Sequence, residues 1–171
     1  MSSQVVIQQH DFDVAQIYDT MRNQAGSDAG AIVTFVGLVR DRNAIAGDGS
    51  TVSTLTLEHY PGMTEKSIAS IIDEAQQRWP VPWVNVVHRV GQMQPSEQIV
   101  LVMVGSAHRD AAFAAAEFIM DYLKTKAVLW KRELSEAGER WLESTDQDAE
   151  RSKSWQLSLI HISEPTRLSA I

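Results

Sequence analysis

The chain has 171 residues, of which 44% are hydrophobic and 22% charged, and this is typical of one globular domain with a sizeable core. Its formal net charge of −7 argues against a protein that binds nucleic acid through bulk positive charge. The absence of cysteine excludes disulfides, thiolate metal ligands and a cysteine nucleophile from this sequence.

The two ends of the chain carry no predicted membrane or export signal. The amino-terminal residues lack the pattern of a signal peptide, and no apolar run approaches the roughly 20 residues that cross a bilayer, so we expect a cytoplasmic protein. Near the other end, "LSLIHISEPTR" resembles a translated sequencing-adapter sequence. We therefore expect residues 1–156 to form a single domain and residues 157–171 to be a non-native tail.

Four elements are predicted in the first half of the chain. Residues 12–24 have helical apolar spacing, and residues 30–41 are rich in β-branched and aromatic residues that favour a strand. The glycine-, aspartate- and asparagine-rich residues 41–52 indicate an exposed loop. Alternating leucines over residues 53–60 predict a half-buried strand, and residues 61–80 place their isoleucines on one face of an amphipathic helix.

The second half continues with two strands, a helix and a hairpin. Residues 83–93 and 97–109 have the composition of strands, and the second is so apolar that we expect it at the centre of its sheet. Residues 110–124 predict an alanine-rich helix, and residues 127–134 a strand that pairs back with residues 140–144. The element order predicts an α+β fold with a largely antiparallel sheet and two main packing helices.

Several common catalytic motifs are absent from the sequence. It has no glycine-rich phosphate loop, no Rossmann fingerprint, no HExxH and no Gly-x-Ser-x-Gly nucleophile motif. The five histidines show no metal-ligand spacing, so we expect no metal site. The remaining candidates for chemistry are cations at the ends of predicted elements.

Two groups of cations lie at strand ends. His108 and Arg109 stand directly before a helix, where free backbone N–H groups and the helix dipole favour an anion. A solvated strand end, with Asp110 neutralising Arg109, explains this pair equally well. Arg40 ends a buried strand, where its planar guanidinium suits phosphate or carboxylate, although a solvated loop arginine is the simpler interpretation.

Two further pairs contain a histidine and are assigned structural roles. Glu58 and His59 are consecutive in a strand and face opposite sides, so at most one of them lines any single pocket. His59 is interpreted as a structural residue near the following turn. His88 and Arg89 are interpreted in the same way and are expected at the edge or surface of the protein.

The segment "DYLKTKAVLWKRE", residues 121–133, is the most cationic part of the chain. Its "VLW" favours a strand, which places Lys124 at a helix end and Lys131 on the next strand. Lys126 is expected to be solvated. A lysine held among apolar walls and other cations can act as an acid–base or nucleophilic group, whereas surface lysines with packed stems are the default interpretation.

Five stretches together resemble the large, catalytic subunit of molybdopterin synthase. They are "TFVGLVRDRN", "LTLEHYPGMTEK", "VVHRVGQM", "SAHRDAAFAAAEFIMDYLKTKAVLWKRE" and "GERW", in order between Gly30 and Trp141. The resemblance implies a hammerhead-type α+β fold and a sulfurtransferase of molybdenum cofactor biosynthesis. Such an enzyme converts cyclic pyranopterin monophosphate into molybdopterin by inserting two dithiolene sulfurs.

The resemblance also implies partners and site residues. The sulfur comes from the C-terminal Gly-Gly thiocarboxylate of a small ubiquitin-like subunit, and the assembly is a heterotetramer built on a homodimer of the large subunit. No metal or redox cofactor, nucleic acid or membrane is implied. The matched residues are catalytic Lys124 and Lys131, substrate-binding Arg40, His108 and Arg109, and Arg132 beside the same pocket. Which chain of the dimer supplies Arg40 stays open.

Two other functions use the same cations. The first is a non-catalytic scaffold subunit that grips the acidic C-terminal tail of a partner. The second is a metal-free cyclic phosphodiesterase that uses His108 with Lys124. Reconstitution with a thiocarboxylated partner separates them from the sulfurtransferase.

Overall fold

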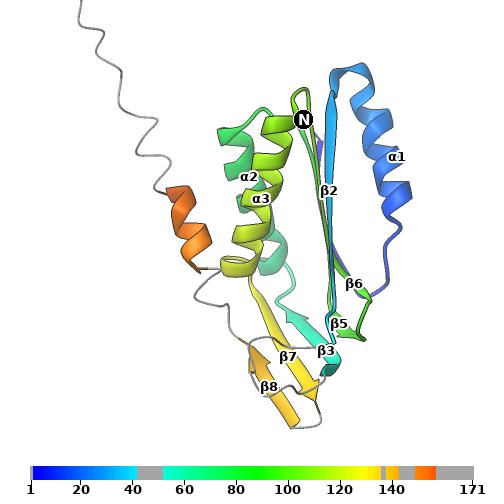
Figure 1. The fold of residues 1–171 in the computed structure, drawn as a ribbon, viewed down its shortest axis with the longest axis vertical. Coiled ribbons are helices and arrows are strands. Elements are labelled where there is room, and N and C mark those ends of the chain that lie inside the picture. The colour runs from blue at the N-terminus through cyan, green and yellow to red at the C-terminus, as the bar shows by residue number, and fades with distance from the viewer. Residues whose placement is uncertain (1, 42–51, 136–137, 143–148, 157–171) are drawn as a thin grey trace, which may run out of the picture.

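The computed structural model describes residues 2–41, 52–135, 138–142 and 149–156. Most of the predicted loop over residues 41–52 and the whole of the expected tail, residues 157–171, lie outside the described residues. The division into one domain and a non-native tail therefore stays a prediction. The described part is an α+β structure with two four-stranded sheets (Figure 1).

The main sheet has the strand order β1-β4-β6-β2. Its strands are β1 (Ser2–Gln8), β2 (Ala31–Leu38), β4 (Trp83–Arg89) and β6 (Gln98–Ser106). β6 lies between β4 and β2, antiparallel to both and buried over most of its length, which confirms the central position predicted from its apolar run. β1 runs parallel to β4 and was not predicted, because its apolar core of Val5, Val6 and Ile7 is short.

Helices cover both faces of the main sheet (Figure 1). α2 (Met63–Arg78) and α3 (Arg109–Thr125) lie on one face, and α1 (Val14–Ala25) lies on the other. Phe118 and Tyr122 of α3 are fully buried in the core on the first face, and Met21 of α1 packs on the second. The two predicted packing helices are thus present, with α1 as a third. In the described ranges, no helix is both long and apolar enough to cross a membrane.

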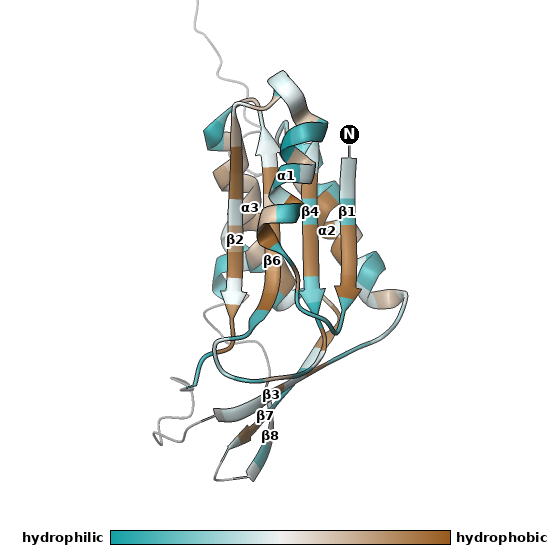
Figure 2. Ribbon diagram, turned by 90° about the vertical axis from the view of Figure 1, so that its right-hand side faces the viewer, coloured by the Kyte–Doolittle hydropathy of each residue, from teal (hydrophilic) through white to brown (hydrophobic). Residues whose placement is uncertain are grey.

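The small sheet lies beyond one end of the main sheet and has the order β5-β3-β7-β8 (Figures 1 and 2). Its strands are β3 (Val52–His59), β5 (Gly91–Met93), β7 (Leu129–Ser135) and β8 (Gly138–Leu142). The sequence predicted one sheet, but β3 and β7 pair with each other and not with the strands of the main sheet. Gly91, at φ +87°, turns the chain from β4 in one sheet to β5 in the other.

A helical segment over residues 149–156 packs beside α3 and was not predicted. Its Trp155 ring meets the rings of Trp79 and Phe118 edge-on, each with centroids 5.6 Å apart. The Trp155 indole N–H also donates to Asp121 Oδ2 at 2.8 Å, which gives that buried carboxylate a partner. The segment therefore extends the core on the side of α2 and α3.

Candidate active site

Lys131 lies on the face of the small sheet that is turned toward the main sheet. In β7 it stands opposite Leu57 of β3, and directly opposed residues project to the same face. Leu57 is buried and clusters with Val39 and Ile99 at the end of the main sheet. Because Lys131 itself is exposed, its amine reaches solvent at the boundary between the two sheets. We call this boundary, lined by Val39, Leu57 and Lys131, the sheet junction.

Lys124 lies in the last turn of α3, at the end of the helix that is nearest the small sheet and from which the chain passes into β7 (Figure 1). The link between the two elements is tied to α2. The Thr64 hydroxyl donates to the Val128 carbonyl oxygen at 2.7 Å, and the Val128 N–H donates to Ser67 Oγ at 3.3 Å. These bonds set where α3 ends and β7 begins, so they set the spacing of Lys124 and Lys131.

Lys126 belongs to the surface, as predicted. Its ammonium lies 3.7 Å from Glu74 Oε2 and 3.8 Å from the centre of the Tyr122 ring. The side chain is 47% exposed. A surface ion pair of this kind contributes little to stability, and Lys126 is well suited as a control for the two other lysines.

Arg40 follows β2 at the same end of the main sheet as the sheet junction. The residue before it, Val39, is buried in the junction cluster. The Val39 N–H donates to the Glu97 carbonyl oxygen at 2.9 Å, and the Val39 carbonyl oxygen accepts from the Ser96 N–H at 2.8 Å. The turn before β6 therefore anchors the backbone that carries the exposed Arg40 side chain.

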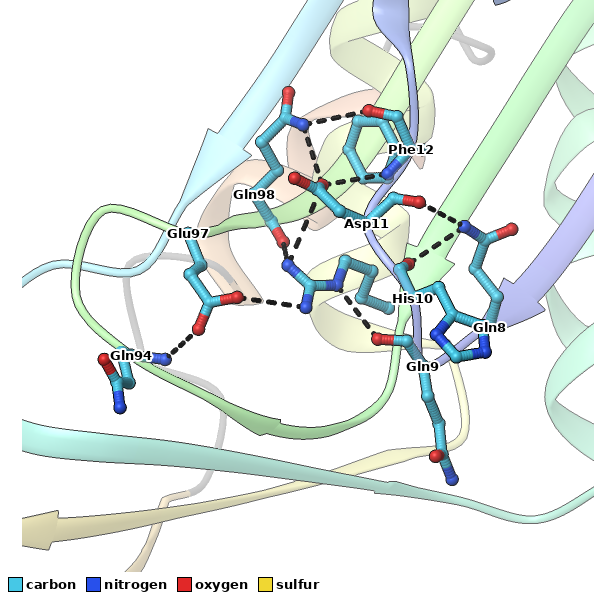
Figure 3. Close-up of polar contacts among 9 residues, drawn as sticks. Gln8, Gln9, His10, Asp11, Phe12, Gln94, Glu97 and Gln98 are labelled. Atoms are coloured by element: carbon cyan, nitrogen blue, oxygen red, sulfur yellow. Dashed lines mark hydrogen bonds and ion pairs between the residues drawn. The ribbon is translucent and has the colours of Figure 1, made fainter.

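Arg89 holds that turn in place, and it is buried instead of lying at the surface as the sequence suggested. Its guanidinium donates to the carbonyl oxygens of Gln9 at 3.2 Å and Gln98 at 2.9 Å, and to Glu97 Oε1 at 3.1 Å (Figure 3). The Gln94 N–H and Arg89 both lower the pKa of the Glu97 carboxyl, so it stays ionised. One side chain thus joins the end of β1 to the turn that anchors Val39.

His88 was also expected at the surface, but it is only 8% exposed. Its Nδ1 lies 2.9 Å from the Arg89 carbonyl oxygen. The pKa of His88 is lowered to about 4, mainly by burial and to a smaller extent by the charge of Lys131, although the hydrogen bond to the Arg89 carbonyl opposes the shift. The imidazole is therefore neutral at pH 7. The prediction failed because pairing with β1 and β6 on both sides buries the end of β4.

Arg132 lies on the opposite face of the small sheet from Lys131, since consecutive strand residues point to opposite sides. Its guanidinium lies 3.2 Å from Glu139 Oε2 and 3.8 Å from Glu58 Oε1. It lines a shallow hollow of about 250 Å³ on that outer face with Thr54, Thr56, Gln92, Leu134 and Glu139. The structure does not bring Arg132 together with Lys131.

His108 and Arg109 lie at the opposite end of α3 from Lys124. His108 is the residue before α3, and Arg109 is its first residue, whereas Lys124 is in its last turn, about 22 Å away along the helix axis. Arg109 lies 3.7 Å from Asp110 Oδ1 in an ion pair that is almost fully exposed. Within one chain, the predicted anion-binding residues therefore form two separate groups.

The pairing of β2 with β6 shows that Arg40 is also far from His108. β2 and β6 are antiparallel, with Ala31 opposite Ser106 and Leu38 opposite Gln98. Arg40 thus follows the Leu38 end, and His108 follows the Ser106 end, about 23 Å away along the strands. Among the described residues, no group of three His, Cys, Asp or Glu side chains is arranged to hold a metal ion.

These features define an α+β protein of two sheets. It carries Lys131 and Arg40 at the sheet junction and Lys124 at the end of α3, and cations of this kind suit an anionic substrate. The chain belongs to the MoaE protein family, whose model matches residues 7–126. It is 54% identical over 156 residues to the molybdopterin synthase catalytic subunit of Vibrio cholerae, covering 91% of this chain and 100% of that protein. It is 47% identical over 153 residues to the molybdopterin synthase catalytic subunit of Escherichia coli, and the match covers 90% of this chain and 98% of that protein.

A solved structure has the same fold. The molybdopterin biosynthesis MoaE protein from Burkholderia ambifaria superposes with a TM-score of 0.76 at 42% identity and covers 91% of this chain and 99% of that chain. The α+β class predicted from the sequence is therefore confirmed, whereas its description as a hammerhead stays a prediction.

Proposed function

We propose that this chain is the catalytic subunit of a molybdopterin synthase, a sulfurtransferase that converts cyclic pyranopterin monophosphate into molybdopterin. A small ubiquitin-like subunit with a C-terminal Gly-Gly thiocarboxylate supplies the two dithiolene sulfurs. The observation that carries the proposal is the 54% identity to a molybdopterin synthase catalytic subunit, over 91% of this chain and 100% of that protein, in a chain that places Lys124 at the end of α3 and Lys131 on β7. The reaction takes place in the cytoplasm.

The two lysines supply a proton-transfer group and a positioning group for this reaction. The substrate's cyclic phosphate is opened and sulfur is installed at two adjacent carbons, so charge develops on oxygen atoms in both steps. Cationic groups stabilise that charge, and an amine near the reacting atoms can donate or accept a proton. Lys124 is the principal acid–base group beside the thiocarboxylate, Lys131 positions the reacting centre, and Arg40 binds the anionic part of the substrate.

His108 and Arg109 bind the same substrate from a second copy of the chain. One pterin cannot span the length of α3, so these residues serve the site of Lys124 only if another subunit brings them there. β2 is an edge strand, and Phe35 and Leu38 on it are 41% and 52% exposed. An exposed apolar edge strand favours pairing with another strand.

Antiparallel pairing of β2 with its twofold-related copy gives the required geometry. In an isologous contact, each strand meets the same strand of the partner. The end of β2 that leads to Arg40 then lies beside the end of the partner's β2 near which His108 and Arg109 stand. Each dimer therefore has two composite sites, each with lysines from one copy and the His108–Arg109 pair from the other.

Mixed dimers test this arrangement. Chains with Lys131→Ala and chains with His108→Ala, each of low activity alone, are unfolded together and refolded at equal amounts. Half of the dimers then combine one chain of each kind, and one of their two sites is intact, so we expect recovery of about one quarter of wild-type turnover. The measurement is the rate of dithiolene formation.

The matched control mixes Lys131→Ala with Lys124→Ala. Both residues belong to the same end of one chain, so no mixed dimer contains an intact site and turnover should stay at the level of the single variants. Recovery in this control, or none in the first mixture, would contradict the composite site.

Reconstitution tests the function itself. The wild-type chain, the thiocarboxylated small subunit and the cyclic pterin are combined, and we expect dithiolene product in proportion to the thiocarboxylate consumed. A chain that binds the small subunit but forms no product would be the scaffold subunit instead. Hydrolysis of the cyclic phosphate without the small subunit would favour the phosphodiesterase.

A further inference from the structure

A cavity of about 240 Å³ lies on the face of the main sheet that α1 covers, between β1, β4 and the start of α1. Its apolar lining is formed by side chains that also pack α1 on the sheet: Val6, Phe12, Ile17 and Val87. The strand order places the cavity at the β1 edge, whereas the dimer contact proposed above lies at the β2 edge. That contact therefore leaves the cavity uncovered.

Asn85 places an amide between two apolar side chains of β4. Trp83 and Val87 project to the same face of the strand and pack with α1, and Met103, opposite Asn85, is fully buried. Asn85 is only 7% exposed, yet its side chain makes no hydrogen bond within the described ranges. Every fully enclosed side-chain nitrogen or oxygen in those ranges has a partner, so the Asn85 amide opens into the cavity that it lines.

Two carboxylates and a second amide add acceptors to the cavity. The Gln8 amide nitrogen donates to two backbone carbonyl oxygens after β1, at 2.9 and 3.0 Å, which fixes the orientation of the amide (Figure 3). Asp11 Oδ1 and Asp13 Oδ1 accept from backbone N–H groups at 2.8 and 3.0 Å. No donor in the described part of the chain reaches Gln8 Oε1 or the Oδ2 atom of either aspartate. Three oxygens are therefore left to accept from a ligand.

The charge around the cavity is negative. Asp11 and Asp13 line it together with neutral side chains. The buried Arg89 side chain lies 3.8 Å from Asp11 Oδ1 and offsets part of that charge. Asp13 is the N-cap of α1, so its carboxylate stands where the helix end would otherwise attract an anion. The cavity therefore favours a cation that donates several hydrogen bonds, and it repels the phosphate of the proposed substrate.

We propose that this cavity binds a guanidinium group carried on a short apolar stem. A guanidinium donates five N–H groups in one plane and accepts none, which suits the free oxygens of Gln8, Asp11 and Asp13. Asn85 Oδ1 is a further acceptor at the buried end, and the stem packs on the apolar lining. A cavity smaller than the roughly 300–1,000 Å³ of most ligand pockets suits a group of this size.

The guanidinium group has two sources, a free small molecule and an arginine side chain of another protein. The inference does not rest on the proposed function, because the cavity contains none of the cations assigned to the sulfurtransferase site. An amide that only faces water would have the same burial, so the test measures binding directly.

Selective labelling lets the Asn85 amide report a ligand. The chain has three asparagines, Asn23, Asn43 and Asn85, so ¹⁵N-labelled asparagine gives three pairs of side-chain amide signals in NMR. The probe is n-butylguanidinium, and we expect a saturable shift of the Asn85 signals with a Kd on the order of 1 mM for so small a ligand. The exposed Asn23 is the internal control and should not shift. Absence of a saturable shift at Asn85 overturns the proposal.

Probes with the same stem separate the chemistry of the head group. n-Butylurea has a similar planar shape without the charge, and it should bind at least about tenfold more weakly, because hydrogen bonds to a charged donor are about twice as strong as neutral ones. n-Butyl phosphate, an anion, should not shift the Asn85 signals. Equal affinities for the urea and the guanidinium probe would contradict a site for a cation.

Two substitutions locate the contacts, with affinities measured by saturation-transfer NMR of the probe. Asn85→Leu has a similar shape without the amide, so binding of n-butylguanidinium should weaken at least about tenfold while the melting temperature does not fall. Asp13→Asn keeps an N-cap acceptor and loses the charge, so binding should weaken about fivefold at unchanged melting temperature. Asp19→Asn, on the exposed side of α1 and outside the cavity, is the matched control and should change neither. Wild-type affinity in Asp13→Asn, or in a folded Asn85→Leu chain, overturns the proposal.

A blocked Gly-Arg-Gly peptide distinguishes the two sources of the group. If the peptide binds within about threefold of n-butylguanidinium, the cavity admits an arginine side chain of another protein. If only n-butylguanidinium binds, the ligand is a free small molecule. Binding of neither excludes a guanidinium site.

Discussion

Replacement of Lys131 by alanine is expected to reduce the turnover of the reconstituted synthase at least about a hundredfold, because Lys131 positions the reacting centre and a misplacement of about 1 Å can cost a factor of that size. Lys131 shares its face of the small sheet with the buried Leu57, so the loss removes an amine from the sheet junction and leaves the core beneath it intact. Lys124→Ala should have an effect of the same order. Single-turnover rates of dithiolene formation measure both.

The nearby Lys126 makes the experiment specific. It lies in the link between α3 and β7, but its partners are Glu74 and the Tyr122 ring on the surface. Lys126→Ala should keep turnover within about twofold, because exposed ion pairs contribute little. Binding of the small subunit should be unchanged in Lys131→Ala. If Lys131→Ala and Lys124→Ala both keep full turnover while that binding is intact, the catalytic assignment is wrong.

Replacement of Arg89 by methionine is expected to lower the free energy of unfolding by about 2–4 kcal/mol. Its side chain is 7% exposed and donates to two backbone carbonyls, which lose a charged donor in the variant. The partner carboxylates of Asp11 and Glu97 are 63% and 40% exposed and can regain water, so the loss stays below that of a fully buried pair. Denaturant unfolding followed by tryptophan fluorescence measures the change.

Arg22 provides the matched control for Arg89. Its ion pair with Asp19, at 3.3 Å, joins two side chains that are each about 60% exposed. Arg22→Met should change the free energy of unfolding by less than about 0.5 kcal/mol. Arg89→Lys should lie between the two methionine variants, because one ammonium cannot reach acceptors placed for a planar fork. An Arg89→Met variant as stable as Arg22→Met would show that the contacts around Arg89 do not hold the turn.

The local pattern of apolar residues was sufficient to predict the long helices and the central strand. The isoleucines of α2 and the apolar residues of the alanine-rich α3 recur at helical spacing, which predicts two helices. The apolar run of β6 has no polar residue to face water, which predicts a strand buried on both faces. The end of α3 at Thr125 was also predicted, because the strand-forming residues after it oppose further helix. The resemblance to a known family then selected Lys124 and Lys131 among the cations.

Long-range pairing explains what the sequence did not reveal. β1 has too short an apolar core to be predicted, yet it covers one side of β4, and this is why His88 and Arg89 are buried. A polar residue at a strand end is solvated or buried according to its neighbours across the sheet, and those neighbours are distant in sequence. The segment with Trp155 was missed for the same reason, since its ring is stabilised by Trp79 and Phe118.

The sequence alone determined the fold class and the end of the helix near Thr125, because both depend on local composition and spacing. The catalytic roles of Lys124 and Lys131 come from the family resemblance and stay a prediction. Only the tertiary structure decided that Lys131, and not Arg132, lies on the face of the small sheet turned toward the main sheet, and that His88 and Arg89 are buried. Which face of a strand is turned inward, and whether a strand end is buried, follow from how the strands pair and how the two sheets pack. Both are properties of contacts between distant segments, which no single stretch of sequence encodes.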